Sequence, residues 1–139
     1  MKSLNTSTGY VVRLEKGEEL YATLEDFARE QKIKGAFLTG LGGLTQALIG
    51  YYNLERKKYV FRHVKGVKEL VSLNGNIAKI GDSIALHLHG VVSDDRNKSY
   101  GGHIKEAICG GTIEIHIVTL DTELTRKPNP EIGLPLLEL

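Results

Sequence analysis

The segment that most constrains the fold runs from Gly81 to His103 and begins as an alternation of apolar and polar residues. His87 and His89 stand two positions apart within it, with Leu88 between them. Successive side chains of a β-strand point to opposite faces, so both imidazoles leave the same face, with Cβ atoms roughly 6–7 Å apart. The other face carries three aliphatic side chains, Ile84, Leu86 and Leu88. The pattern predicts a strand with one buried face and one face able to bind a ligand.

A third histidine follows after a polar loop. Residues 93–100 form that loop, and Gly101-Gly102-His103 then opens another apolar segment. If the two segments pair, all three imidazoles meet at one point. Three neutral imidazoles suit Zn²⁺ or a similar divalent ion and leave a fourth position for water or a substrate oxygen. The sequence therefore predicts a metal site of His87, His89 and His103, with Asp94 either solvating the loop or accepting a hydrogen bond from one imidazole.

The overall charge does not indicate a nucleic-acid partner. The 139 residues carry a formal net charge of +1, whereas phosphate binding depends on clustered excess Lys and Arg. The two basic clusters, 56–58 and 126–127, are expected to be solvated turns. No run of about 18 apolar residues and no leader pattern occurs, which favours a cytoplasmic protein with no membrane partner. The single cysteine, Cys109, lies in an apolar segment and is expected to be a buried, inert thiol.

Periodicity along the chain predicts one helix among several strands. An apolar stripe at helical spacing, Leu20, Leu24, Phe27 and Ala28, predicts a helix from about residue 18 to 31. Strands are expected at 9–14, 35–53, 57–64, 66–79 as two pieces, 83–92, and 103–120 as two strands or one long bent strand. The division of 66–79 rests on Asn74-Gly75, the strongest short hairpin signal. The glycines at 40, 42 and 43 indicate a bulge, a bend or a close backbone approach.

The last segment, 121–139, contains all three prolines and is expected to have neither a helix nor a central strand. Its apolar end is expected to dock on the body or on a neighbouring subunit. No linker or repeat divides the chain, so we expect one domain over residues 1–139. The predicted fold class is α+β, with roughly seven mainly antiparallel strands and one main helix.

Four segments together resemble the PPC (plants and prokaryotes conserved) domain, in the stand-alone prokaryotic form. They are the glycine-rich 38–43, the run GVKELVSLNG at 66–75, LHLH at 86–89 and GGH at 101–103. The resemblance covers about residues 10–120. It implies an α+β domain with a seven-stranded antiparallel sheet that assembles as a homotrimer, and a divalent metal held by the histidines at 87, 89 and 103.

The resemblance leaves the biochemical activity open. Prokaryotic members of the family are commonly labelled predicted DNA-binding proteins, by analogy with plant relatives whose separate Arg-Gly-Arg-Pro AT-hook contacts DNA, and this chain has no Arg-Gly-Arg. A non-enzymatic metal-binding oligomer, in which the ion is structural or binds a small anionic ligand, is the main hypothesis. A zinc-dependent enzyme and a DNA-binding protein are the alternatives.

A second resemblance concerns the same residues. Gly81, His87-x-His89, Asp94 and Gly101 are similar to the first metal motif of cupins, with Asp in place of the usual Glu. The later histidine-bearing motif of cupins is missing. A cupin-like metal enzyme is therefore kept only as a further alternative.

Overall fold

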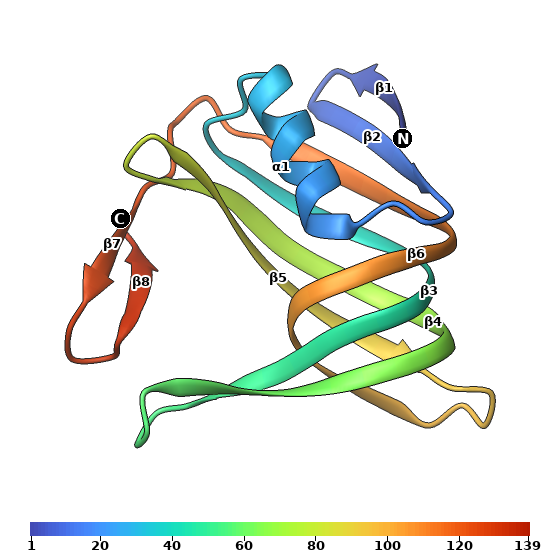
Figure 1. Ribbon diagram of the computed structural model, residues 1–139. Helices are drawn as coiled ribbons and strands as arrows, with labels where there is room; N and C mark the ends of the chain where they lie inside the picture. Colours follow the sequence, from blue (N-terminus) through green and yellow to red (C-terminus); the bar gives the residue numbers. More distant parts are fainter.

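The computed structural model describes all 139 residues, which form one α-helix and eight β-strands (Figure 1). In chain order the elements are β1 (Lys2–Thr6), β2 (Gly9–Glu15), α1 (Leu20–Glu30), β3 (Ala36–Asn53), β4 (Lys58–Ile80), β5 (Ser83–Ser93), β6 (Ser99–Thr119), β7 (Arg126–Asn129) and β8 (Leu134–Leu137). The expected α+β class is confirmed. The helix α1 has 11 residues, which is too short to span a membrane.

Six strands form one strongly curved antiparallel sheet in the order β1-β2-β6-β3-β4-β5. The long strand β6 pairs with β2 over its second half and with β3 from His103 to Thr119, and its first residues also pair with β5. This extra pairing joins β6, β3, β4 and β5 into a ring. It brings the start of β6, where His103 lies, against residues 89–93 of β5, so that His103 faces His89 with His87 two positions away.

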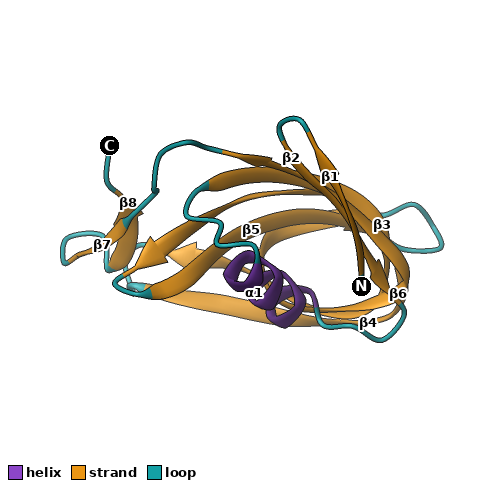
Figure 2. Ribbon diagram, turned by 90° about the horizontal axis from the view of Figure 1, so that it is seen from above, coloured by secondary structure: helices purple, strands orange, loops and turns teal.

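Helix α1 packs inside the curve of the sheet (Figure 2). Its buried side chains are the predicted stripe, Leu20, Leu24, Phe27 and Ala28. The Glu19 carboxylate accepts the backbone N–H of Ala22 and caps the first turn. These residues join a core of 24 buried residues that also holds Leu88 and Ile104, the neighbours of the histidines on β5 and β6. The predicted helix is confirmed, one or two residues shorter at each end.

The predicted turn at Asn74-Gly75 is wrong. Strand β4 runs through both residues without a break, and Gly75 pairs with Leu38 on one side and Leu88 on the other. A Cβ at Gly75 would lie 2.2 Å from the His87 carbonyl oxygen, so this glycine allows close strand approach rather than a turn. The hairpin turn lies instead at Gly81-Asp82, where Gly81 has φ +58°.

Other differences concern the ends of the chain. Strand β1 has no apolar alternation and its five residues are all exposed, yet it pairs with β2 at the edge of the sheet. The segment 103–120, left open as one strand or two, is the single strand β6. The tail forms a separate two-stranded hairpin, β7–β8, with proline facing proline at Pro128 and Pro135. Proline is compatible with an edge strand, because its missing backbone N–H is not needed for a hydrogen bond to a further strand.

Candidate metal centre

The two histidines of β5 are positioned by the alternation of that strand. Leu88 between them is fully buried, so its neighbours turn away from the core. His87 is half-buried and His89 is exposed. Asn76 and Asn74 on β4 are the pairing partners of His87 and His89. This register fixes the position of each ring along the strand direction.

His103 is brought to the same place by the pairing of β5 with β6. Its Cα partner on β5 is His89, and Gly102 is paired with Gly90 in the next position. A Cβ at Gly102 would lie 2.4 Å from the backbone oxygen of Gly50, so only a glycine lets β6 approach β3 this closely. The two glycines before His103 therefore serve the packing that places its ring.

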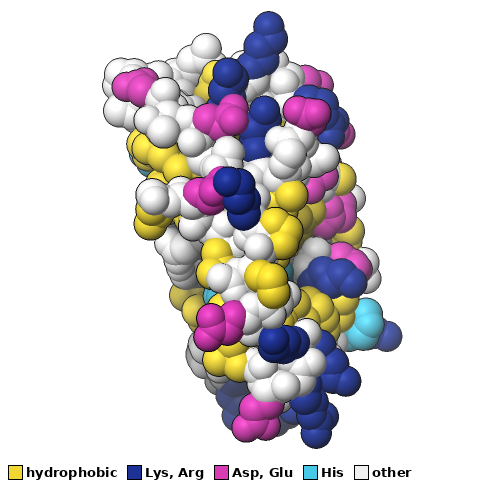
Figure 3. Space-filling model, turned by 90° about the vertical axis from the view of Figure 1, so that its left-hand side faces the viewer, with side chains coloured by type: hydrophobic (Ala, Val, Ile, Leu, Met, Phe, Trp, Pro, Cys, Tyr) yellow, Lys and Arg dark blue, Asp and Glu magenta, His cyan; other side chains and the backbone are white.

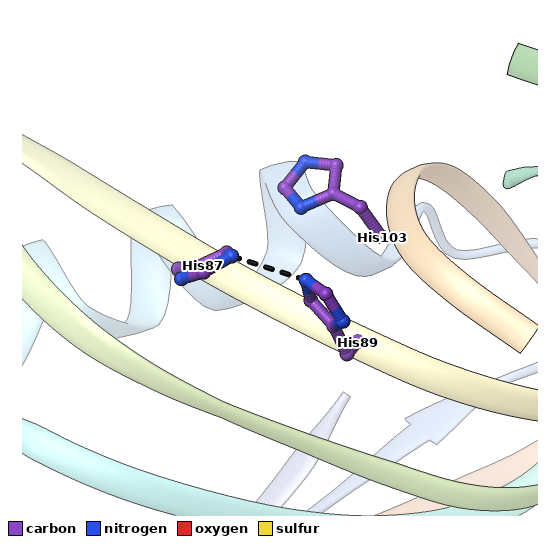
Figure 4. A group of neighbouring side chains, drawn as sticks. All are labelled: His87, His89 and His103. Atoms are coloured by element: carbon purple, nitrogen blue, oxygen red, sulfur yellow. Dashed lines mark hydrogen bonds between the residues drawn. The ribbon is translucent and has the colours of Figure 1, made fainter. Parts of the chain in front are cut away.

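The three imidazoles converge (Figure 4). Their ring centroids are 4.9 Å apart for His87–His89, 5.3 Å for His87–His103 and 5.4 Å for His89–His103. One ring nitrogen from each lies within 4.8 Å of the others, and the Nε2 atoms of His87 and His89 are 3.2 Å apart. Three Zn–N bonds of about 2.0–2.1 Å in tetrahedral geometry hold their nitrogens about 3.3–3.4 Å apart. The spacing of His87 and His89 fits this value.

The electrostatics also suit a cation held by neutral rings. Burial, with smaller contributions from the charges of His87 and His89, lowers the pKa of His103 to about 4. Burial, then the nearby Arg126 charge and His89, lowers the pKa of His87. Both rings are therefore neutral at pH 7 and have a lone pair to offer. The Nδ1 of His103 is buried with no hydrogen-bond partner, an arrangement that a metal bond would satisfy.

Groups on β4 and β7 surround the three rings. Tyr59 stacks beside His103 at 4.6 Å between centroids, and Phe61 lies behind it at 6.3 Å. Arg126 of β7 places its Nη2 3.3 Å from the Nδ1 of His87 and donates to the Asn76 side-chain oxygen at 2.8 Å. The three imidazoles thus have two aromatic rings of β4 and the guanidinium group of Arg126 as neighbours.

A cavity of about 260 Å³ opens beside the cluster. His87, His103, Tyr59 and Arg126 form its polar side. The remaining lining is apolar, from Ile80, Ala85, Leu86, Leu134, Pro135 and Leu136. Two larger hollows, of about 620 and 530 Å³, lie elsewhere and contain none of the three histidines.

Asp94, His116 and Cys109 lie outside the cluster. Asp94 accepts the backbone N–H groups of Arg96 and Lys98 within the β5–β6 turn, and not an imidazole as one hypothesis had it. These two bonds hold the pKa of Asp94 below its usual value. His116 is exposed on β6, and Cys109 is fully buried as expected.

Sequence reasoning missed Arg126 and Tyr59 as neighbours of the site. Arg126 had been assigned to a solvated turn, but it is half-buried and bonded to the Pro135 carbonyl as well as to Asn76. Tyr59 lies within the strand expected at 57–64, for which no role at the site is predicted. Neither residue has a local sequence signal, because each reaches the histidines through long-range packing.

One family model and several solved structures match most of the chain. The model of the Plants and Prokaryotes Conserved (PCC) domain matches residues 1–121. The structure of a candidate DNA-binding protein from Ralstonia eutropha JMP134 is 31% identical and superposes with a TM-score of 0.94, over 99% of this chain and 96% of that one. The structure of a metal-containing protein from Archaeoglobus fulgidus is 28% identical, with a TM-score of 0.87 over the full length of both chains.

Curated relatives are much longer than this chain. A bifunctional protein GlmU from Synechococcus sp. (strain JA-3-3Ab) is 29% identical over 127 residues. The match covers 89% of this chain but only 19% of the relative. The chain thus spans about one-fifth of the length of that protein.

Proposed function

Because the chain belongs to the Plants and Prokaryotes Conserved domain family and carries three convergent imidazoles, we propose that it is a metal-binding oligomeric protein. His87, His89 and His103 hold one divalent ion, Zn²⁺, and leave one coordination position open. The observation that carries this proposal is the mutual approach of three ring nitrogens to within 4.8 Å. When bound, the ion supplies a positive charge and a site for an oxygen ligand.

The donor set supports zinc over calcium or magnesium. All three ligands are nitrogen, and no carboxylate oxygen belongs to the cluster. Imidazole suits Zn²⁺, whereas Ca²⁺ and Mg²⁺ prefer oxygen ligands. The low pKa of His103 supports the same assignment, because its ring needs no deprotonation at neutral pH.

The test is the metal content of the purified full-length protein. We expect near one zinc per chain by inductively coupled plasma mass spectrometry, and loss of that zinc in His87→Ala. His116→Ala is the matched control, because His116 is an exposed histidine on β6 outside the cluster, and it should keep the metal. A wild-type protein that takes up no divalent ion, even after incubation with zinc, would refute the proposal.

Self-association as a homotrimer is part of the proposal. It rests on the family resemblance and is supported by large apolar side chains at least half exposed on β3 and β4, among them Phe37, Leu41, Tyr51, Val67 and Val71. Sedimentation equilibrium should give a mass three times the 15.3 kDa of the chain. A monomer at micromolar concentration would contradict it.

DNA binding is the second candidate function, favoured by the name of the R. eutropha relative. Lys and Arg side chains are interspersed with Asp and Glu at both the upper and the lower end of the face shown in Figure 3. With a net charge of +1, the chain is expected to bind duplex DNA weakly at physiological salt. Tight binding in a fluorescence-anisotropy titration at that salt would favour DNA as the partner.

A further inference from the structure

The cavity beside the histidines is lined by one cationic side chain, Arg126. Its Nη1 donates to the Pro135 carbonyl at 3.0 Å and its Nη2 to the Asn76 side chain at 2.8 Å. Its Nε is buried with no hydrogen-bond partner. No Asp or Glu lines the cavity. The local charge is therefore positive, with one donor unsatisfied.

The contact between Arg126 and His87 further limits which ligands the cavity can accept. This inference rests on the proposed metal site. The Nε2 of His87 is the atom that faces His89, at 3.2 Å. If that nitrogen holds the ion, the ring proton sits on Nδ1. Nδ1–H and the Arg126 Nη2–H groups are then two donors 3.3 Å apart with no acceptor between them. An anionic oxygen placed beside them would accept from both.

The remaining lining of the cavity determines which chemical group the anion can have besides its charged oxygens. Six of its ten lining residues are apolar, and Tyr59 adds an aromatic ring. The volume of about 260 Å³ lies below the ~300–1,000 Å³ typical of sites for drug-sized ligands. This lining would remove water from an inorganic phosphate without supplying hydrogen bonds in its place, whereas it would bury a short hydrocarbon chain favourably.

We propose that the metal-loaded site binds a small organic carboxylate, with its carboxylate on Arg126 and beside the ion, and its apolar part in the cavity under the β7–β8 hairpin. Arg126 is the specificity-determining residue, because a guanidinium offers a fork of donors that matches a carboxylate. Leu134 and Leu136 of β8 cover the apolar part.

The experiment uses the zinc-loaded full-length protein and isothermal titration calorimetry. Butyrate is the probe, and butyramide, which has the same shape without the charge, and inorganic phosphate are the comparisons. We expect saturable butyrate binding, with butyramide and phosphate at least about tenfold weaker. Equal binding of butyrate and butyramide, or tighter binding of phosphate, would overturn the proposal without any variant.

Variants then locate the carboxylate. Arg126→Met should weaken butyrate binding about tenfold or more, since a charge-assisted hydrogen bond is lost. Lys127→Met is the matched control, because Lys127 is the adjacent base but points away to Glu138, and it should change the affinity less than about twofold. If Arg126→Met unfolds, Arg126→Lys is used in its place. It should also weaken butyrate binding, because an ammonium group cannot donate two parallel hydrogen bonds to a carboxylate as a guanidinium does.

Zinc content, measured on every sample, separates the two proposals. A wild-type protein that cannot be loaded with zinc refutes the metal site itself. The carboxylate site is refuted if the zinc-loaded wild type binds no butyrate, or if Arg126→Met retains its zinc and binds butyrate as tightly as the wild type. Either result leaves the metal site standing.

Discussion

His89 and His103 lie directly opposite each other on antiparallel strands β5 and β6. The turn between the strands is held by the Asp94 carboxylate, which accepts two backbone N–H groups. A shift of this pairing by one residue would turn His103 to the other face of its strand. The register of a single strand pair therefore decides whether three imidazoles can share one ion.

Gly102→Ala should damage the site without touching a histidine. The new Cβ would meet the backbone oxygen of Gly50 at 2.4 Å, and β6 must move away from β3 to relieve the overlap. We expect a loss of about 1–3 kcal/mol in the free energy of unfolding and weaker zinc binding. Gly111→Ala on the same strand is the control, because no atom lies within 4 Å of its added Cβ. Urea unfolding and zinc titration of both variants check this, and equal behaviour would contradict it.

Leu88→Ala should destabilise the strand that carries two of the histidines. Leu88 is fully buried between them, so truncation leaves a cavity in the core and costs about 2–5 kcal/mol. Leu54→Ala is the matched comparison, because Leu54 is 64% exposed in the turn between β3 and β4 and its truncation should change stability by less than about 0.5 kcal/mol. Thermal or urea unfolding of the two variants measures the difference. A loss below about 1 kcal/mol for Leu88→Ala would argue against the buried position.

The metal-free protein should lose stability as the pH falls from about 6.5 toward 4. The folded state lowers the pKa of His103 from 6.5 to about 4, so between these values the unfolded state binds more protons. The free energy of unfolding therefore decreases with falling pH in this window, and the contribution is constant above it. Urea unfolding in the presence of a chelator measures the slope.

His103→Asn is the variant that isolates this effect, because it removes the titrating ring. Its stability should depend less on pH between 6.5 and 4 than that of the wild type. His116→Asn, on the exposed part of β6, should keep the wild-type slope. An unchanged slope in His103→Asn would assign the acid sensitivity to other groups.

Cys109 should be unreactive in the folded protein. The thiol is fully buried, and burial raises its pKa, so little thiolate is available. We expect labelling by a thiol reagent at pH 7.5 to be roughly a hundredfold slower, or more, in buffer than in urea, because the thiol is exposed only by opening of the core. Labelling at the same rate in both conditions would show that the β6 region opens freely.

The helix and the histidine strand could be predicted because their signals are local. The apolar stripe of α1 and the alternation at 84–89 repeat at the period of the element that they form. The Asn74-Gly75 turn was mispredicted for a physical reason. Glycine permits a turn and also a close strand approach, and at Gly75 the neighbouring His87 carbonyl requires the second. Strand β1 carried no signal because both of its faces are exposed.

The amino-acid order by itself determined that His87 and His89 share a face, because alternation is a property of any extended chain. It also placed His103 directly after two glycines, which permit close packing between strands. Only the tertiary structure decided that His103 stands opposite His89, and that Arg126 and Tyr59 border the same cavity. Those relationships depend on register and on packing between distant segments, which a local sequence pattern does not encode.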